Sequence, residues 1–202
     1  MIRALYGGSF DPVHAGHVAL VRTLLDRGLA DRVHVVPAGQ SPLKAEAPRA
    51  TAPQRRRLLE LALSGIAGVR IDLRELERAG RSYTVTTLAA LAAEHPEDRW
   101  RLVMGADAAA DFARWRESER LLSLAEPLVV ARGGAELPPP LAGRAELLVD
   151  FDHPASASAI RRDLAAGVLP GPQLLPAPVA AVIMAEGLYG WPGPASLPEE
   201  SP

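Results

Sequence analysis

The sequence has no cysteine, no long apolar segment and almost no net charge, and each absence excludes a class of protein. Without cysteine there are no disulfides, thiolate zinc sites or cysteine nucleophiles. No apolar run reaches the roughly 18 residues of a membrane-spanning helix, and the first residues lack the apolar core of a signal peptide. The formal net charge of −2 creates no overall field for nucleic acid or an anionic membrane. We therefore expect a cytoplasmic protein that binds neither nucleic acid nor membrane and holds any polyanion at a local site.

Lysine is nearly absent as well, since Lys44 is the one lysine among the 22 basic residues. Such a lysine can mark a position that requires a compact ammonium, because arginine and lysine are not interchangeable. A chance surface remnant explains it too, so both interpretations stay open. The dinucleotide fingerprint GxGxxG is also missing, which disfavours a bound NAD-type redox cofactor.

Short apolar runs alternate along the chain with segments of helical spacing. Strands are predicted at residues 2–7, 32–39, 69–76, 99–107, 127–134 and 145–151. Helices are predicted at 17–28, 53–65 after a cap at Thr51, 82–96, 108–125 with breaks, 156–167 and 176–190. This alternation indicates an α/β, Rossmann-like, doubly wound fold, with a mostly parallel sheet and helices on both faces. Ligands of such folds bind beyond the carboxyl ends of the strands, where the strand order reverses.

The composition fits a single domain. Its 202 residues, 48% of them hydrophobic, are enough to bury one core. The sequence shows no second block of different composition, no internal repeat and no long linker, so one domain is expected over residues 1–190. Residues 191–202 are rich in proline, serine and glutamate and are expected to form a flexible tail.

Two glycines, an Asp–Pro turn and two histidines separate the first predicted strand from the first predicted helix, in the stretch YGGSFDPVHAGHVAL. Gly7 and Gly8 have no side chains, so a ligand can approach their amides closely. His14 and His17 fall in or just before the first helical turn, where a spacing of three places them on one face. The amides and dipole at a helix start favour an anion. The stretch therefore predicts a phosphate site.

Two other roles for the histidines remain open. Metal ligation would require a third and a fourth ligand nearby, and the sequence has neither an HExxH pattern nor cysteine. A structural role, in which His14 and His17 bond loop carbonyls, needs no ligand. A second feature, the basic run Arg55–Arg57 at a helix start, is interpreted as a solvated face.

The opening stretch also carries a family resemblance. GGSFDPVHAGH resembles the GxFDPxHxGH signature of nucleotidyltransferases, and SASAIRRDL resembles their later serine-rich helix start followed by Ile-Arg. SYTVTTL, MGADAAADFARWR, TAPQRRRLLELA and the ending EGLYG resemble the bacterial nicotinate-nucleotide adenylyltransferases in particular. The resemblance covers nearly all of residues 1–190 in order. It departs at Leu43, where the family often has histidine, and at Arg116, where an aromatic residue is common.

This resemblance implies an enzyme of NAD biosynthesis that transfers AMP from ATP to nicotinate mononucleotide and releases pyrophosphate. The substrate phosphate attacks the α-phosphorus of ATP in line, without a covalent enzyme intermediate. Such a reaction depends on positioning and on positive charge around the phosphorus. ATP and nicotinate mononucleotide are then the partners, and Mg²⁺ enters with the triphosphate. No protein ligand of the metal is predicted, and a homo-oligomer is left open.

The resemblance also implies roles for individual residues. Catalytic contacts with the phosphates are expected from His14, His17, Lys44 and Arg161. Binding of ATP is expected from Gly7, Gly8, Ser9, Phe10, Gly105, Asp107, Ser156 and Ser158. Asp107 is alternatively the cap of the next helix. The nicotinate mononucleotide is expected at Thr84 and Trp115, with Trp115 alternatively a half-buried core residue.

Three other functions are weighed against this one. A sister adenylyltransferase acts on nicotinamide mononucleotide or on phosphopantetheine, and the latter type usually has threonine in place of the first histidine, so His14 argues against it. A non-catalytic nucleotide sensor is expected to lose His14, His17 or Arg161, and all three are present. A tRNA-charging enzyme would need a far longer chain.

Overall fold

The computed structural model describes residues 1–40, 47–78, 80–131 and 136–192. The chain divides into two compact units, each formed by several segments of the sequence. The sheet unit contains Met1–Ser9, Ala19–Pro48 and Gly65–His153, and the helical unit contains Phe10–Val18, Arg49–Ser64 and Pro154–Pro202. The single domain expected over residues 1–190 stays a prediction. Of the expected tail, only Trp191 and Pro192 belong to the described residues.

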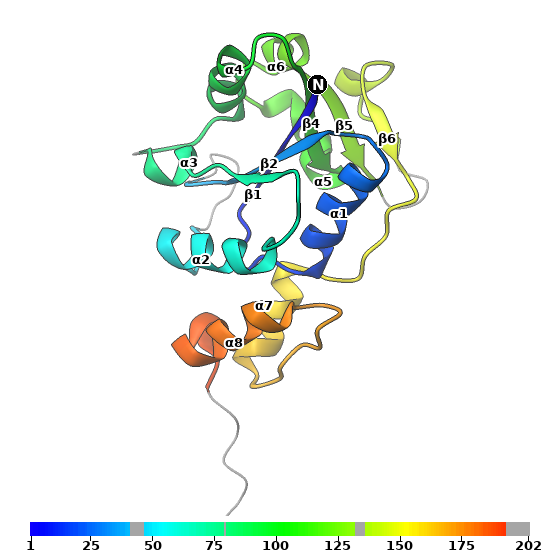
Figure 1. Ribbon diagram of the computed structural model, residues 1–202. Coiled ribbons are helices and arrows are strands. Elements are labelled where there is room, and N and C mark those ends of the chain that lie inside the picture. Colours follow the sequence, from blue (N-terminus) through cyan, green and yellow to red (C-terminus); the bar gives the residue numbers. More distant parts are fainter. Residues whose placement is uncertain (41–46, 79, 132–135, 193–202) are drawn as a thin grey trace, which may run out of the picture. The chain divides into compact units, whose positions relative to one another are not determined.

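The sheet unit is built on a six-stranded parallel sheet with the order β3-β2-β1-β4-β5-β6 (Figure 1). Its strands are β1 (Ile2–Gly8), β2 (Arg32–Pro37), β3 (Val69–Ile71), β4 (Arg99–Gly105), β5 (Glu126–Val130) and β6 (Glu146–Leu148). The chain runs outward from β1 to β3 on one side and from β4 to β6 on the other. The strand order therefore reverses between β1 and β4, as in a doubly wound fold. This confirms the predicted Rossmann-like architecture.

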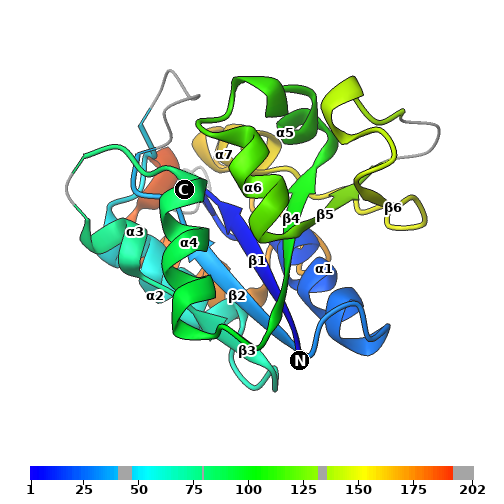
Figure 2. The same cartoon turned by 90° about the horizontal axis from the view of Figure 1, so that it is seen from above.

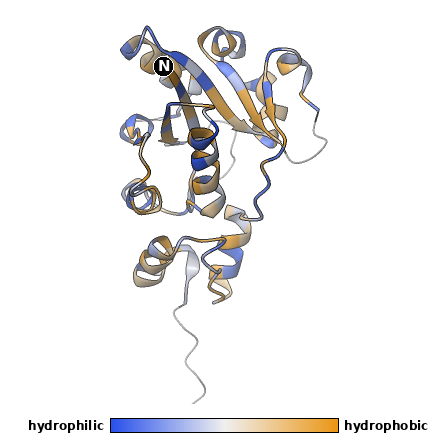
Figure 3. Ribbon diagram, turned by 45° about the vertical axis from the view of Figure 1, so that its right-hand side comes forward, coloured by the Kyte–Doolittle hydropathy of each residue, from blue (hydrophilic) through white to orange (hydrophobic). Residues whose placement is uncertain are grey.

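Helices cover both faces of the sheet, as predicted (Figure 2). On one face α4 (Thr84–Glu94) packs beside α6 (Ser118–Leu124). On the other face lies α1 (Ala15–Asp26), which belongs to the sheet unit from Ala19 onward. Apolar residues predominate along the central strands (Figure 3), and the core beneath α4 and α6 includes the buried Leu5, Leu88, Leu102, Met104, Phe112 and Leu121. None of the described helices is both long enough and apolar enough to cross a membrane.

The strand predicted at 69–76 is shorter in the structure, because β3 ends at Ile71 and a short helix, α3 (Arg74–Glu77), follows. The Asp72 carboxylate accepts a hydrogen bond from the backbone N–H of Arg74 at 3.1 Å. Aspartate side chains favour turns through local bonds of this kind, which compete with the ladder of a strand. The segment predicted as the second half of the strand therefore leaves the sheet.

The helical unit contains α2 (Ala52–Ala62), α7 (Ala157–Ala165) and α8 (Ala177–Glu186). A capping box starts α2, because the Thr51 hydroxyl accepts from the Gln54 amide while the Gln54 side chain accepts from the Thr51 amide. Thr51 is therefore the cap that the sequence predicts. α2 packs against α8, and Arg57 donates a hydrogen bond to Glu186 at 2.5 Å.

The prediction that Arg55–Arg57 form a solvated face is wrong for Arg55. Only 3% of Arg55 is exposed, whereas Arg56 and Arg57 are exposed. Adjacent residues of a helix point in different directions, and Arg55 shares its face with the buried Leu58 and Leu59. Burial lowers the pKa of Arg55, and the nearby charge of Asp11 acts against this change.

Candidate functional site

A cavity of about 310 Å³ lies in the sheet unit, at the carboxyl ends of β1 and β4. Doubly wound proteins bind their ligands at this edge of the sheet. The lining contains six residues that the sequence predicts for substrate binding, namely Gly7, Gly8, Ser9, Thr84, Gly105 and Trp115. These residues are far apart in the sequence, and the fold brings them to one cavity.

Gly7 and Gly105 leave space beside their backbone in the cavity wall. A Cβ atom added to Gly7 would lie 3.8 Å from the Leu5 side chain and 4.0 Å from the Val36 carbonyl oxygen, which are ordinary contact distances. One added to Gly105 would meet nothing within 4 Å among the described residues. Packing inside the protein therefore does not require glycine at these positions, which agrees with a ligand that approaches the backbone closely.

Thr84 and Trp115 line the same cavity from different segments. Thr84 is the first residue of α4, and the N-cap residue Tyr83 makes no side-chain capping bond, so the amides at this helix start are not capped by that side chain. The Trp115 ring packs against Phe112, with their centroids 5.5 Å apart. Trp115 is half-buried and also lines the cavity, and its contact with a nucleotide stays a prediction.

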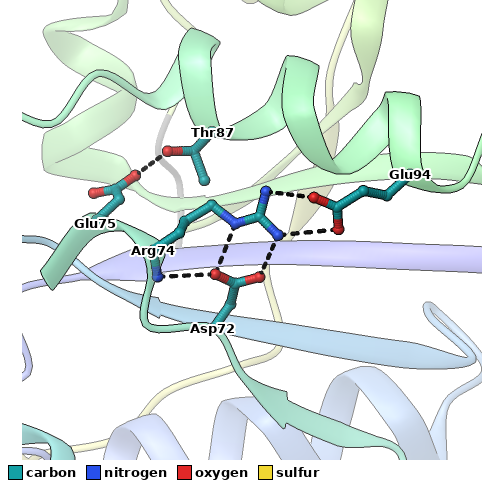
Figure 4. A network of polar contacts seen from close by, with 5 residues as sticks. All are labelled: Asp72, Arg74, Glu75, Thr87 and Glu94. Carbon is teal, nitrogen blue, oxygen red and sulfur yellow. Dashed lines mark hydrogen bonds and ion pairs between the residues drawn. The ribbon is translucent and has the colours of Figure 1, made fainter. Parts of the chain in front are cut away.

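Sequence reasoning missed a buried carboxyl group in the cavity wall. Glu75 on α3 is 7% exposed, and its Oε1 accepts a hydrogen bond from Thr87 Oγ1 on α4 at 2.6 Å (Figure 4). Burial raises the pKa of Glu75, while the hydrogen bonds from Thr87 and Ser82 act against that rise. Burial therefore disfavours the charged form of this carboxyl group. The signal in the sequence was an acidic residue shortly before the SYT segment, inside a predicted strand.

Arg74 fastens α3 to α4 beside Glu75 (Figure 4). Its guanidinium donates to both carboxylate oxygens of Asp72 at 2.8 Å, and to those of Glu94 at 2.9 and 3.1 Å. Burial alone would raise the pKa of Asp72, but the hydrogen bonds and charge of Arg74 outweigh it and lower that pKa. A Cβ atom at Gly39 would collide with the Glu75 carbonyl oxygen, so only glycine allows this close approach. The part of the cavity wall formed by α3 is therefore held in place by the bonds of Arg74 and by its contact with Gly39.

His14 and His17 lie together in the helical unit, as their spacing predicts. Their rings are stacked, with centroids 3.6 Å apart and planes inclined by 20°. The backbone N–H of His14 donates to His17 Nδ1 at 3.1 Å. Because Nδ1 accepts this bond, a neutral His17 carries its proton on Nε2, where it is a donor for an anion.

The turn before the histidines is held by Phe10 and Asp11. Phe10 is buried with a φ of 47°, a conformation uncommon for residues other than glycine, and its ring meets the edge of His17 with centroids 4.9 Å apart. Asp11 precedes Pro12 through a cis peptide bond. The Asp11 carboxylate accepts from the amides of Arg49 at 2.8 Å and Ala50 at 3.0 Å. Asp11 thus ties this turn to the segment before α2.

Arg161 on α7 reaches the same turn. Its Nη1 donates to the Asp11 carbonyl oxygen at 2.6 Å, which joins two signatures that lie 150 residues apart in the sequence. Ser156 is the N-cap of α7 and makes no side-chain capping bond, because its hydroxyl lies 2.9 Å from that of Ser158. The start of α7 is therefore not capped by the Ser156 side chain.

Gly105 and Asp107 lie where β4 leads into α5 (Ala106–Ala110). Gly105, which has no side chain, is the N-cap of this helix. Asp107 is exposed in the first turn, so its carboxylate does not serve as the helix cap weighed from the sequence.

The predicted residues divide between the two units. The sheet unit holds Gly7, Gly8, Ser9, Thr84, Gly105, Asp107 and Trp115, and the helical unit holds Phe10, His14, His17, Ser156, Ser158 and Arg161. Lys44 and Leu43 lie outside the described residues. Within the described ranges, no group of three or more His, Cys, Asp or Glu side chains could hold a metal ion. Ligand contacts of all these residues stay predictions.

Known proteins resemble this chain over almost its whole length. A model of the cytidylyltransferase-like family matches residues 5–163. Curated relatives bear the name "Probable nicotinate-nucleotide adenylyltransferase". The protein from Gloeobacter violaceus is 35% identical over 95% of this chain and 97% of its own length, and that from Stenotrophomonas maltophilia is 39% identical over 96% and 99%. The chain belongs to the nicotinate-nucleotide adenylyltransferase family.

Solved structures confirm the fold of this adenylyltransferase family member. The structure of Plasmodium falciparum nicotinic acid mononucleotide adenylyltransferase complexed with APC superimposes with a TM-score of 0.74, over 94% of this chain and 98% of that one. The same enzyme complexed with NaAD gives 0.73 over the same shares. Sequence identities of 17% and 18% mean that these likenesses show the architecture alone.

Proposed function

We propose that this family member transfers AMP from ATP to nicotinate mononucleotide, with nicotinate adenine dinucleotide and pyrophosphate as products. The observation that carries the proposal is the cavity whose wall combines Thr84 and Trp115 with Gly7, Gly8 and Gly105. An aromatic face suits a cationic pyridine ring, and open backbone amides suit a nucleotide. The names of the relatives and the ligand of the Plasmodium falciparum enzyme support the same substrates.

The reaction forms one bond and breaks one. An oxygen of the mononucleotide phosphate attacks the α-phosphorus of ATP, and the bond from that phosphorus to the oxygen bridging to the β-phosphate breaks. Pyrophosphate leaves with the bonding electron pair. The protein needs no nucleophile, so its contribution is to hold the reactants in line and to stabilise charge on the equatorial oxygens.

The groups of the helical unit are assigned to the phosphates. His17 is assigned to the α-phosphate, since the bond from the His14 amide to its Nδ1 leaves Nε2–H as the donor. His14, stacked beside it, is assigned to the triphosphate. Arg161 and the start of α7 at Ser156 and Ser158 are assigned to the β- and γ-phosphates, because guanidinium groups and helix-start amides bind phosphate.

The groups of the sheet unit are assigned to the mononucleotide and to a ribose. Trp115 is assigned to the face of the pyridine ring, and Thr84 with the first amides of α4 to its carboxylate. Asp107, whose carboxylate is exposed, is assigned with Gly105 to a ribose hydroxyl. Lys44 keeps its predicted role at the reacting phosphates.

Magnesium enters this proposal as part of the ATP substrate. The described residues contain no cluster of three or more possible ligands, and Asp11 already uses its carboxylate for two backbone amides. They therefore do not form the cage of oxygen ligands that would hold Mg²⁺ without a nucleotide. No step is assigned to a metal held by the protein. The cytoplasmic location and a homo-oligomer stay predictions.

The test is a coupled assay for pyrophosphate release with ATP, Mg²⁺ and one of three acceptors: nicotinate mononucleotide, nicotinamide mononucleotide or phosphopantetheine. We expect release with nicotinate mononucleotide and a product with the mass of nicotinate adenine dinucleotide. Release with one of the other acceptors alone would assign the chain to a sister activity. ATP binding without release with any acceptor would identify a nucleotide sensor.

A further inference from the structure

Arg116 places a positive charge on the cavity wall. It directly follows Trp115 and lines the cavity. Its guanidinium carbon lies 4.7 Å from the centre of the Tyr83 ring, and Tyr83 directly precedes Thr84 at the start of α4. The charge of Arg116 is therefore close to the helix start that the proposed function assigns to the pyridine carboxylate.

The charge of Arg116 is the less compensated of the two arginine charges on this wall. Among the described residues, the charged side chains that line the cavity are those of Glu75, Arg114 and Arg116. Arg114 Nη1 donates to Asp111 Oδ1 at 3.0 Å. In the described part of the chain, the one carboxylate in ion-pair contact with Arg116 is that of Glu117, which lies 3.5 Å from Nε. The Glu117 carboxylate also accepts a shorter hydrogen bond from Arg120, at 3.0 Å. The Nη groups of Arg116 thus remain available to a ligand.

Glu75 is the acidic residue on this wall, and its burial disfavours the charged form. It is buried beneath α4, where Thr87 donates to its carboxyl group. Burial raises the pKa of Glu75 and so disfavours its charged form. Burial thus weakens the opposition of Glu75 to the positive charge of Arg116, which favours an anionic ligand group near the start of α4.

We propose that Arg116 selects the acid over the amide form of the pyridine mononucleotide by its charge, an inference that rests on the proposed function. Stacking on Trp115 favours the cationic ring of either form, so it does not discriminate. The carboxylate has only acceptors and a full negative charge, whereas the amide brings an NH₂ group and no charge. Charge-assisted bonds from the Arg116 Nη groups therefore favour the acid alone. Because the Arg116 side chain is 59% exposed, the effect is moderate.

Three substitutions test this assignment. Arg116→Met removes the charge but keeps an apolar chain over the Tyr83 ring, and Arg116→Lys keeps the charge. Arg114→Met is the matched control, because it removes a neighbouring charge that Asp111 already pairs. For each variant, kcat/KM is measured with nicotinate mononucleotide and with nicotinamide mononucleotide, at saturating ATP and Mg²⁺.

We expect Arg116→Met to lower kcat/KM for the acid by roughly 3- to 10-fold, chiefly through KM, and to leave the amide value unchanged. Arg116→Lys should recover most of the loss, and Arg114→Met should leave the acid-to-amide ratio as in the wild type. Rising salt should lower this ratio for the wild type more than for Arg116→Met, since salt screens an exposed charge.

Two outcomes would overturn the inference while the wild type still turns over nicotinate mononucleotide, so that the proposed function stands. An equal fall of kcat/KM for both substrates in Arg116→Met would show that Arg116 acts through packing. An unchanged acid-to-amide ratio in the same variant would show that its charge selects nothing. A wild type that uses neither mononucleotide would instead refute the proposed function, and this inference with it.

Discussion

Replacing His17 separates its proposed catalytic role from its structural one. In the structure His17 accepts a hydrogen bond from the His14 amide and stacks on the His14 ring. In His17→Asn, the side-chain oxygen lies near the position of Nδ1 and keeps an acceptor for that amide, but no group reaches the position of Nε2. His17→Ala keeps neither function. The two variants should therefore differ in stability and agree in activity.

The expected magnitudes follow from these contacts. His17→Ala loses the hydrogen bond from the His14 amide, worth about 0.5–1.5 kcal/mol. It also loses ring contacts with His14 and Phe10, worth about 0.5–1.5 kcal/mol each. The free energy of unfolding should fall by about 2–4 kcal/mol, less than the ~5–15 kcal/mol that stabilises a typical domain. His17→Asn should lose about 1–3 kcal/mol, since the bond to the amide is kept. Loss of the Nε2 donor should lower kcat by roughly 10²–10³-fold in both variants.

The assay combines pyrophosphate release at saturating substrates with urea unfolding of the wild type and both variants. A His17→Asn enzyme with near-normal kcat would refute the assignment of Nε2 as donor, because asparagine has nothing there. Normal turnover by a folded His17→Ala would remove His17 from the reaction altogether. Equal stability of the two variants would show that the bond from the His14 amide contributes little.

Four further changes test other parts of the site and fold. Burial lowers the pKa of His34 to about 4, so as the pH falls the unfolded chain binds a proton at this residue before the folded protein does. Urea unfolding of the wild type should therefore show a loss of roughly 2–3 kcal/mol in the free energy of unfolding between about pH 6.5 and pH 4. His34→Gln should not show this loss. Glu75 has a raised pKa when folded, so its contribution to stability is lost as the pH rises above the ordinary pKa of a glutamate. Glu75→Gln should therefore gain stability relative to the wild type as the pH rises through that range, as urea unfolding checks, and a difference that stays constant with pH would contradict this. Arg161→Lys should lower kcat by roughly 10-fold, because an ammonium group cannot replace the planar guanidinium that binds the Asp11 carbonyl oxygen and the phosphates at the same time. A kcat equal to that of the wild type would refute this role. ATP with Mg²⁺ should slow the labelling of Lys44 by an amine-selective reagent, and Lys44→Ala should lose turnover or triphosphate binding. Labelling that ATP does not slow, together with full activity of Lys44→Ala, would show that Lys44 is a surface residue without a role in the reaction.

Much of the fold could be predicted because its signals are local. The helices predicted at 17–28 and 82–96 agree with α1 and α4 within two residues at each end. The strand predicted at 69–76 failed because Asp72 bonds to the Arg74 amide and guanidinium and turns the chain into α3. Hydrophobic spacing alone does not reveal such a bond. The prediction that Arg55 is solvated failed for a related reason, because the burial of this residue depends on what packs against α2.

The site could be predicted in part. Short-range patterns located the glycines of the cavity and the pair His14 and His17, whose stacking follows from their spacing. The bond from Arg161 to the Asp11 carbonyl joins residues 150 positions apart, and no local pattern indicates it. Glu75 was missed for the same reason, because it reaches the cavity wall only through the packing of α3 against α4.

The central claim is that this chain uses the acid form of the pyridine mononucleotide as the acceptor of AMP. It is tested most directly by the ratio of kcat/KM for nicotinate mononucleotide to that for nicotinamide mononucleotide, measured with the wild type at saturating ATP and Mg²⁺. The account predicts a ratio of roughly 10² or more, because a site built for a carboxylate leaves donors unpaired when the amide binds. A ratio near one, or one in favour of the amide, would contradict it.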